Sequence, residues 1–433
     1  MARHPAHRPL AVYLNGRLVG HFRRERTGAV DFKYDQAWLD WENAIPISLS
    51  LPLREDRYIG DPVFAVFDNL LPDNTDIRRR VAERMGAGGY DAHSLLGAIG
   101  RDCVGALQFL PEGSEPPAMA IDGRKVTDAE IATMIANLAR SPLGLGDDRE
   151  FRISIAGAQE RTGLLLLDGR WHVPLGATPT THIIKPQLGM VGDVIDLSHG
   201  VENEHFCLSL VRALGMPAAN TSITDFDGRR VLVIERFDRL WTRDRRLLRV
   251  PQEDCCQALS VPSSRRYQSD GGPGSREVAQ LLKGSDRPDD DRRMFFKALV
   301  VFWLLGATDG HAKNFSVRLA PGGRFRLAPL YDIMSAKHAV DANQIRQNQY
   351  KLAMSAGDNR HYVVGRVQPR HFVQDANAAG MPAGAMQAVF AEILATAPAA
   401  IETTRAAMPT DCPSALIESI VAGFNERLRL LPS

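Results

Sequence analysis

Two aspartates and an asparagine in the last third of the chain are spaced as phosphoryl transfer requires. Asp309 and Asn314 stand five positions apart in the run D-G-H-A-K-N, and Asp332 follows in the pair Tyr331-Asp332. In such an arrangement one carboxylate orients the attacking hydroxyl and accepts its proton, while an amide oxygen and a second carboxylate hold Mg²⁺ against the phosphates. A polar loop whose Asp and Asn side chains only complete turns is the alternative, and the motif alone does not decide between the two.

An upstream lysine and glutamate favour phosphoryl transfer. Lys185 ends the apolar run T-H-I-I-K, which predicts a strand, and Glu204 follows nineteen positions later on a predicted helix. A lysine that points into a cleft from such a strand neutralises nucleotide phosphates, and a glutamate on the next helix holds its ammonium group by a charge-assisted bond. A single lysine is more commonly exposed to solvent, so this pair counts only together with the aspartates.

Two further segments have the chemistry of a nucleotide site. Residues 155–163 (I-A-G-A-Q-E-R-T-G) lie between two predicted strands, and small residues there let backbone N–H groups approach phosphates. The segment lacks the G-x-x-x-x-G-K-[ST] pattern, which argues against a P-loop NTPase. Residues 235–237 (Glu-Arg-Phe) directly follow a predicted buried strand. Their backbone could contact adenine, and the alternative is that they only lead the chain out of the sheet. Together, the order of these segments along the chain matches a two-lobed kinase.

The sequence predicts a β-rich first part and a mainly helical last third. Residues 10–14 and 17–22 predict a hairpin, because Asn15-Gly16 tolerates the positive φ angles of a tight turn. The polar stretch 261–275 has little periodicity and predicts a long loop, and such loops are often functional. Further strands are predicted at residues 29–34, 47–51, 151–155, 164–167, 171–173, 181–185 and 231–234. Helices are predicted between Pro62 and Pro72, from a cap at Ser198 to Gly215, at 289–305 and at 413–431.

The composition excludes several classes of protein. The chain has 433 residues, 44% of them hydrophobic, and a net charge of +1 from 52 Lys+Arg and 51 Asp+Glu. This balance excludes a disordered polyelectrolyte and gives no overall electrostatic case for nucleic-acid binding. Three arginine clusters (78–80, 243–246 and 265–266) could bind phosphates, but such runs are more often solvated. Because the longest apolar run is too short to span a bilayer and no secretory signal is visible, we expect a cytoplasmic protein with no membrane partner.

The chain resembles the HipA toxins, the serine/threonine kinases of bacterial type II toxin–antitoxin modules, over nearly its whole length. The stretches that carry the resemblance are 45–53 (I-P-I-S-L-S-L-P-L), 67–72 (F-D-N-L-L-P), 99–106 (I-G-R-D-C-V-G-A), 151–160 (F-R-I-S-I-A-G-A-Q-E), 179–185 (P-T-T-H-I-I-K), 235–239 (E-R-F-D-R), 251–254 (P-Q-E-D), 269–274 (S-D-G-G-P-G), 306–317 and 331–333. It implies an α+β, two-lobed protein-kinase-like fold with an added N-terminal β-rich subdomain and a mainly helical C-lobe. The expected domains are that subdomain (1–112), the kinase N-lobe (113–250) and the C-lobe (251–433).

The resemblance also implies roles for individual residues. Asp309 matches the catalytic base, Asn314 and Asp332 match the Mg²⁺ ligands, and Ser154 matches the serine that the family autophosphorylates. Glu204 is expected to position Lys185. Arg161 stands where a relative has lysine, so the charge is kept on a bulkier, planar group. The residues that match the ATP site are Ala156, Gly157, Ala158, Gln159, Glu160, Arg161, Lys185, Glu235, Arg236, Phe237, His311, Ala312, Lys313, Asn314, Tyr331 and Asp332.

By this resemblance we expect an ATP- and Mg²⁺-dependent serine/threonine kinase that acts as a toxin and is neutralised by a HipB-like helix-turn-helix antitoxin. A translation component such as glutamyl-tRNA synthetase is the expected target. The family's basic DNA-contacting segment falls at residues 377–380 (N-A-A-G), which contain no Lys or Arg, so operator DNA is expected to be bound mainly through the antitoxin. Two alternatives stay open: a small-molecule or lipid kinase, because D-x-H-x-x-N resembles phosphoinositide kinases equally well, and a catalytically quiet co-repressor.

Overall fold

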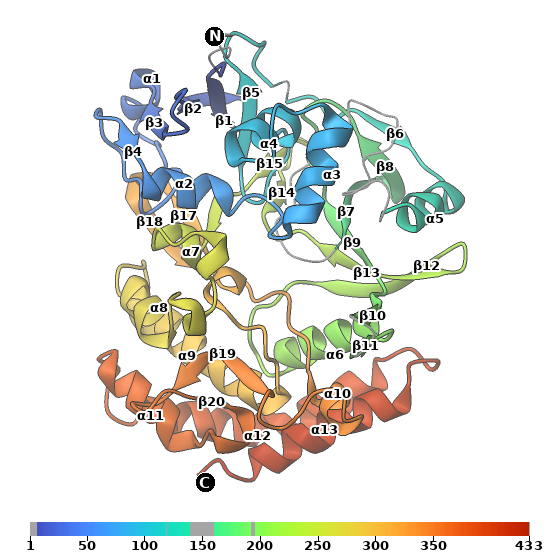
Figure 1. Ribbon diagram of the computed structural model, residues 1–433. Coiled ribbons are helices and arrows are strands. Elements are labelled where there is room, and N and C mark those ends of the chain that lie inside the picture. Colours follow the sequence, from blue (N-terminus) through green and yellow to red (C-terminus); the bar gives the residue numbers. More distant parts are fainter. Residues whose placement is uncertain (1–6, 118, 139–159, 192–194, 433) are drawn as a thin grey trace.

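The computed structural model describes residues 7–117, 119–138, 160–191 and 195–432. Two sheets with their helices form the upper part of the molecule, and a mainly helical body forms the lower part (Figure 1). The mixture of helices and sheets confirms the predicted α+β class. The predicted domain boundaries after residues 112 and 250 stay predictions.

The first sheet has five antiparallel strands in the order β4-β3-β2-β1-β5. The predicted hairpin is confirmed, and its turn residues Asn15 and Gly16 have φ angles of 47° and 81°, as a tight primed turn requires. The strands are β1 (Leu10–Leu14), β2 (Arg17–Arg24), β3 (Val30–Tyr34), β4 (Tyr58–Ile59) and β5 (Leu107–Pro111). The first sheet and four helices make up the part that is called the first region below. These helices are α1 (Gln36–Leu39), α2 (Asp61–Asp68), α3 (Thr75–Met85) and α4 (Ala92–Ile99).

The second sheet has six antiparallel strands in the order β12-β13-β9-β7-β8-β6. Its strands are β6 (Gly123–Lys125), β7 (Thr162–Leu167), β8 (Arg170–Pro174), β9 (His182–Pro186), β12 (Thr221–Phe226) and β13 (Arg229–Glu235). Helices α5 (Asp128–Ala136) and α6 (Gly200–Ala213) and the pair β10 (Gly189–Val191) and β11 (Ile195–Leu197) accompany it. Leu164 and Ile184 of this sheet belong to the same apolar cluster as Phe22 and Phe67 of the first region. The two sheets therefore share a core.

The lower part is built around the buried helix α9 (Pro288–Leu305), whose first turn carries three aspartates that favour a helix start. Gly306 ends the helix at a φ angle of 67°, and a Cβ atom there would lie 1.6 Å from the Tyr350 hydroxyl. The chain therefore leaves α9 three residues before Asp309, so this helix end positions the loop that carries Asp309 and Asn314. None of the helices in the described ranges is long and apolar enough to cross a membrane.

The remaining helices lie in the middle and lower parts of the molecule, whereas the remaining strands run from the upper part, beside the first two sheets, down to the lower part (Figure 1). The helices are α7 (Cys255–Ala258), α8 (Ser275–Leu282), α10 (Lys337–Asp341), α11 (Pro369–Ala378), α12 (Ala385–Ala406) and α13 (Ser414–Leu428). The strands are β14 (Arg239–Trp241), β15 (Leu247–Arg249), β16 (Gln252–Asp254), β17 (Ser316–Ala320), β18 (Arg324–Leu327), β19 (Lys351–Ala356) and β20 (His361–Val363).

Two local predictions are wrong. Residues 47–51 form a turn with a single Ser48–Leu51 bridge rather than a strand, because Ser50 and Leu49 bond to Gln257 and Glu253 instead of a neighbouring strand. Helix α6 is capped at His199, one residue after Ser198, without a side-chain cap. The strand predicted at 151–155 lies outside the described residues.

The buried side chain of Glu253 makes the free energy of unfolding depend on pH. Its side chain is 1% exposed and its Oε1 accepts from the Leu49 N–H at 2.7 Å, while burial raises the pKa of the carboxyl from 4.5 to about 8. Between these two pH values the folded protein keeps a proton that the unfolded chain releases, so the stability present at pH 4.5 is lost as the pH rises to 8. This group changes the free energy of unfolding by up to about 1.4 kcal/mol per pH unit.

Glu253→Gln keeps the acceptor for Leu49 and cannot ionise. We expect the variant to gain stability over the wild type steadily from pH 5 to pH 8, measured by urea denaturation at each pH. A constant difference between the two proteins across this range would contradict the buried, protonated carboxyl. The exposed Glu42→Gln serves as the control.

Candidate active site

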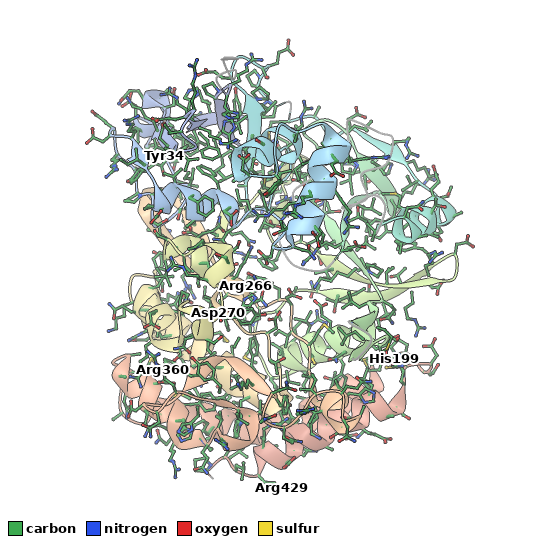
Figure 2. The ribbon with its side chains drawn as sticks, in the orientation of Figure 1. Tyr34, His199, Arg266, Asp270, Arg360 and Arg429 are labelled. Atoms are coloured by element: carbon green, nitrogen blue, oxygen red, sulfur yellow. The ribbon has the colours of Figure 1, made fainter. Side chains whose placement is uncertain are left out.

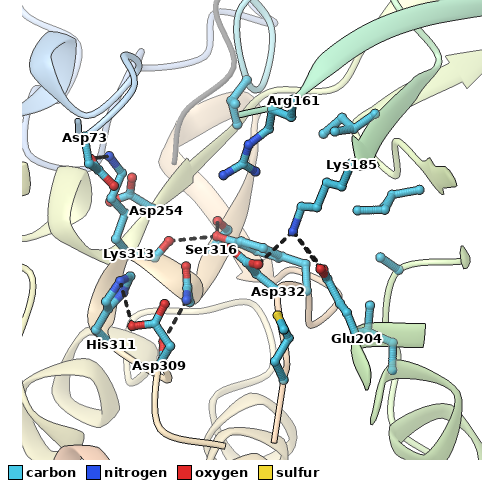
Figure 3. A pocket seen from close by; sticks show the side chains of 18 of the residues that line it. Asp73, Arg161, Lys185, Glu204, Asp254, Asp309, His311, Lys313, Ser316 and Asp332 are labelled. Carbon is cyan, nitrogen blue, oxygen red and sulfur yellow. Dashed lines mark hydrogen bonds and ion pairs between the residues drawn. The ribbon is translucent and has the colours of Figure 1, made fainter. Parts of the chain in front are cut away.

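A cavity of about 350 Å³ collects most of the residues that the sequence singled out (Figure 3). Its walls come from the first region, β9, α6, the exit of β13, and the segments around residues 309 and 332. The predicted site residues that line it are Arg161, Lys185, Glu204, Glu235, Arg236, Phe237, Asp309, His311, Lys313, Asn314, Tyr331 and Asp332.

Lys185 is the centre of a buried ion-pair triad. Its Nζ lies 2.8 and 3.0 Å from the two carboxylate oxygens of Glu204 on α6, and 2.8 Å from Asp332 Oδ1. Lys185 and Glu204 are 3% and 2% exposed. Burial alone would lower the pKa of Lys185, but the two carboxylates hold this pKa above its usual value. The ammonium group therefore stays charged. The cavity therefore contains a fixed positive charge next to an acidic group.

Asp332 is held in an uncommon backbone conformation. Its φ angle of 58° is in the left-handed region, which a non-glycine residue adopts at a cost of roughly 1–3 kcal/mol. The flanking chain is fixed, because Leu330 accepts from the Ala219 N–H at 2.8 Å and Ser335 exchanges two 2.8 Å bonds with Asn203 of α6. Burial alone would raise the pKa of Asp332, but Lys185 and Arg161 hold it well below its usual range. Asp332 is thus a carboxylate at any ordinary pH.

The loop after α9 is folded tightly upon itself. The Asp309 carbonyl accepts from the His311 N–H at 2.8 Å and from the Asn314 Nδ2 at 2.7 Å. The amide nitrogen of Asn314 is thereby engaged, and its amide oxygen is left to bind a cation. The Tyr331 hydroxyl donates to the Lys313 carbonyl at 2.9 Å, which ties this loop to the segment of Asp332. The oxygen donors of Asn314 and Asp332 fit Mg²⁺, which prefers hard oxygen ligands and few protein groups.

One part of the cavity wall is apolar. Ile183 and Ile234 line it together with Phe237 and Tyr331, whose rings lie 5.8 Å apart. At the exit of β13 the N–H groups of Glu235 and Arg236 already donate to backbone carbonyls at 2.9 Å. Within the described part of the chain, the Phe237 N–H donates to no backbone carbonyl. It is therefore the donor that remains for a planar heterocycle such as adenine. The contact of residues 235–237 with adenine stays a prediction, and the Phe237 N–H is the backbone donor best placed for it.

Some predicted site residues lie elsewhere. Ala312 is fully buried in the apolar core of the lower part, and Glu160 lies outside the cavity lining and pairs with Arg80 of α3 at 2.8 Å. Neither side chain is placed to contact a ligand in the cavity. Ser154, Ala156, Gly157, Ala158 and Gln159 lie outside the described residues, so their assignment stays a prediction.

Several cavity residues were not predicted from the sequence. Asn69 and Asp73 come from the first region, and Asp73 pairs with Lys313 across 240 positions of sequence. Gln252, Asp254 and Tyr267 also line the cavity. Burial raises the pKa of Asp254 to about 7, with the opposing charge of Lys313 nearby. These residues lie in or beside F-D-N-L-L-P, P-Q-E-D and the long polar loop, so the family resemblance of these stretches could have pointed to them. No spacing rule, however, linked them to the aspartates and the lysine of the site.

Two family models match the chain. The HipA N-terminal domain matches residues 10–110, and the HipA-like C-terminal domain matches residues 153–401, which is more than half of the chain. The chain belongs to the HipA family of kinases. Residues 309–332 of the cavity all lie within the second match, whereas Asn69 and Asp73 lie within the first.

Individual relatives agree with this. The putative kinase Y4mE of Sinorhizobium fredii is 36% identical over 355 residues, 81% of each chain. The serine/threonine-protein kinase toxin HipA of Shewanella oneidensis is 28% identical over 333 residues, 74% of this chain and 72% of that one. A solved complex of HipA, HipB and operator DNA from Shewanella oneidensis matches with a TM-score of 0.81 at 23% identity, over 98% of both chains. This last likeness shows the two-lobed HipA fold.

Proposed function

We propose that this HipA-family kinase transfers the γ-phosphoryl group of Mg²⁺–ATP to serine or threonine hydroxyls of a protein. The observation that carries the proposal is the triad of Lys185, Glu204 and Asp332, which shares one cavity with Asp309 and Asn314. A fixed lysine, two oxygen ligands for a cation and a carboxylate base are the groups that phosphoryl transfer uses.

The residues act by position and charge. Mg²⁺–ATP supplies the reactive phosphoryl group when it is bound. Lys185 provides the positive charge for the phosphates, and Glu204 keeps its ammonium group in place. Asn314 and Asp332 provide oxygens for the cation. Asp309 accepts the proton of the acceptor hydroxyl, and its side chain is 58% exposed, so an acceptor can reach it from solvent.

The test is incubation of the purified protein with labelled Mg²⁺–ATP and a lysate of its host. We expect labelled phosphoserine or phosphothreonine in a protein, with a translation component such as glutamyl-tRNA synthetase as the proposed target. Label in a lipid or a small molecule would favour the alternative kinase class. The absence of any transfer would favour the catalytically quiet co-repressor and contradict the proposal.

Asp332→Asn is expected to raise the Mg²⁺ concentration needed for half-maximal transfer by roughly ten-fold, because it removes a negatively charged ligand from the cation. The measurement is transfer from labelled ATP as a function of Mg²⁺. Asp227→Asn, at an exposed hairpin turn, is the control. An unchanged Mg²⁺ dependence would show that Asp332 does not bind the cation.

Ser154 is proposed as an autophosphorylation site that switches the enzyme off. It directly precedes residues 155–158, the segment proposed to bind the phosphates, and a phosphoryl group adds nearly two negative charges there. We expect mass spectrometry to find phosphate on Ser154 after incubation with Mg²⁺–ATP, and nucleotide binding to fall as it accumulates. Full ATP affinity in the stoichiometrically phosphorylated protein would contradict the switch.

We further propose that the protein is the toxin of a two-component module with a HipB-like helix-turn-helix antitoxin. The relative whose fold it shares was solved with HipB and operator DNA. At residues 377–380 the carbonyls of Ala379 and Gly380 accept from the buried Arg292, and the segment itself carries no basic side chain. Operator DNA is therefore proposed to be bound mainly by the antitoxin, and the protein alone should not retard operator DNA in a gel.

A further inference from the structure

The loop 261–275 is anchored on both sides of its cavity-lining residues Arg266 and Tyr267. On the side of the first region, Asn69 donates to the Val261 carbonyl at 2.9 Å, and the Ser263 hydroxyl donates to Asp68 at 2.7 Å. On the side of the lower part, the Ser355 N–H donates to the Gln268 side chain at 2.7 Å. Figure 2 shows Arg266 and Asp270 of this loop in the middle of the molecule, between its upper and lower parts.

The loop is also braced internally around Tyr267. The Tyr267 carbonyl accepts from the N–H groups of Asp270 and Gly272 at 3.0 and 2.9 Å. A Cβ atom at Gly272 would lie 2.0 Å from the Arg265 carbonyl, so the tight turn requires glycine. Tyr267 therefore has a fixed backbone position, unlike a residue on a freely moving lid.

Two side chains of this loop contact the proposed catalytic loop. The Tyr267 hydroxyl donates a hydrogen bond to Oδ1 of Asp309. Its ring packs edge-on against His311 at 4.8 Å, and Arg266 donates to Nε2 of His311 at 3.1 Å. Among the described residues no side chain or backbone group bonds to Oδ2 of Asp309, so that oxygen is left for an acceptor hydroxyl.

We infer that Tyr267 is a positioning residue for phosphoryl transfer, which fixes the rotation of the Asp309 carboxylate by bonding Oδ1 and directs Oδ2 at the acceptor hydroxyl. A half-exposed aspartate without such a partner would rotate among several orientations, and only some would present an oxygen to the acceptor. The inference rests on the proposed function of Asp309 and adds to it a residue outside the D-x-H-x-x-N motif.

The anchored loop distinguishes this role from that of a plug. A plug must leave the site before each turnover, but Tyr267 is held by contacts to both parts of the molecule and covers one of the two carboxylate oxygens. Removing a plug would speed transfer. Removing a positioning bond slows the transfer step and leaves ATP binding unchanged, because the bond does not involve the nucleotide residues.

The test is Tyr267→Phe, which removes the hydroxyl and keeps the ring against His311. We expect kcat for transfer from labelled Mg²⁺–ATP to lysate protein to fall roughly ten-fold, with the KM for Mg²⁺–ATP and the melting temperature unchanged. Tyr90→Phe, at a half-exposed tyrosine near α3, is the matched control and should match the wild type. In the Asp309→Asn background Tyr267→Phe should have no further effect, because its role acts through that carboxylate.

The outcomes separate this inference from the proposed function. A wild type that transfers no phosphate overturns both. A wild type that transfers phosphate, together with an unchanged kcat in Tyr267→Phe, overturns the positioning role alone. A raised kcat would make Tyr267 a plug, and a full additional loss in the Asp309→Asn background would show that it acts on something other than Asp309; either result overturns the inference.

Discussion

Asp309→Asn is expected to reduce phosphate transfer about a thousand-fold while the affinity for Mg²⁺–ATP stays within about two-fold of the wild type. Asparagine fills the same space but cannot accept a proton, and the carboxylate lies outside the triad of Lys185, Glu204 and Asp332 that is proposed to meet the phosphates. Because a general base acts in the transition state, its loss appears in kcat. Transfer from labelled ATP and calorimetric ATP binding measure the two quantities.

The control for this variant is Asp227→Asn, the same chemical change at an exposed turn where asparagine tolerates the observed φ angle of 49°. It should transfer phosphate at the wild-type rate. General-base catalysis typically contributes about a hundred-fold or more to the rate. If Asp309→Asn keeps more than about a tenth of the wild-type kcat, Asp309 is therefore not the base.

Asp102→Asn is expected to destabilise the protein by about 3–5 kcal/mol, because it removes one of two carboxylates from a buried cluster of three guanidinium groups. Asp102 is 1% exposed and lies 2.8 Å from Arg239 and 3.0 Å from Arg249, with Arg236 and Thr180 beside it. Burial alone would raise the pKa of Asp102, but the three arginines hold it well below its usual range. Urea denaturation measures the loss.

This cluster also connects the first region to the part of the cavity where adenine is proposed to bind. Asp102 follows α4, whereas Arg236 and Asp238 follow β13 at the proposed adenine contact. The control is Asp168→Asn, whose partner Arg245 is 75% exposed and whose loss should leave stability nearly unchanged. Equal unfolding midpoints for Asp102→Asn and the wild type would contradict a structural role for the buried cluster.

The parts of the site that depend on local order could be predicted from the sequence. Lys185 and Glu204 follow a strand and helix pattern, and the five-residue spacing of Asp309 and Asn314 follows a buried helix end, so their neighbours in the chain determine where they point. Asn15-Gly16 similarly determines its own hairpin. In each case the physical cause lies within about twenty residues of the feature.

The parts that depend on distant contacts could not be predicted. Asp73 meets Lys313 across 240 positions, and no local periodicity marks such a pair. Clustered arginines look like solvated charge in a sequence, yet Arg78 bonds to Asp68 and Arg266 bonds to His311. The turn at residues 47–51 has the apolar composition of a strand, and only its contacts with Gln257 and Glu253 show why it does not form one.

A crystal structure of the protein with Mg²⁺ and a non-hydrolysable ATP analogue would test directly whether the cavity binds the nucleotide. We predict the adenine ring against Phe237 and Tyr331, the phosphates at Lys185, and the cation on oxygens of Asn314 and Asp332, in the cavity that these residues line. A nucleotide bound at another site, or a cation coordinated without either Asn314 or Asp332, would contradict the proposed function.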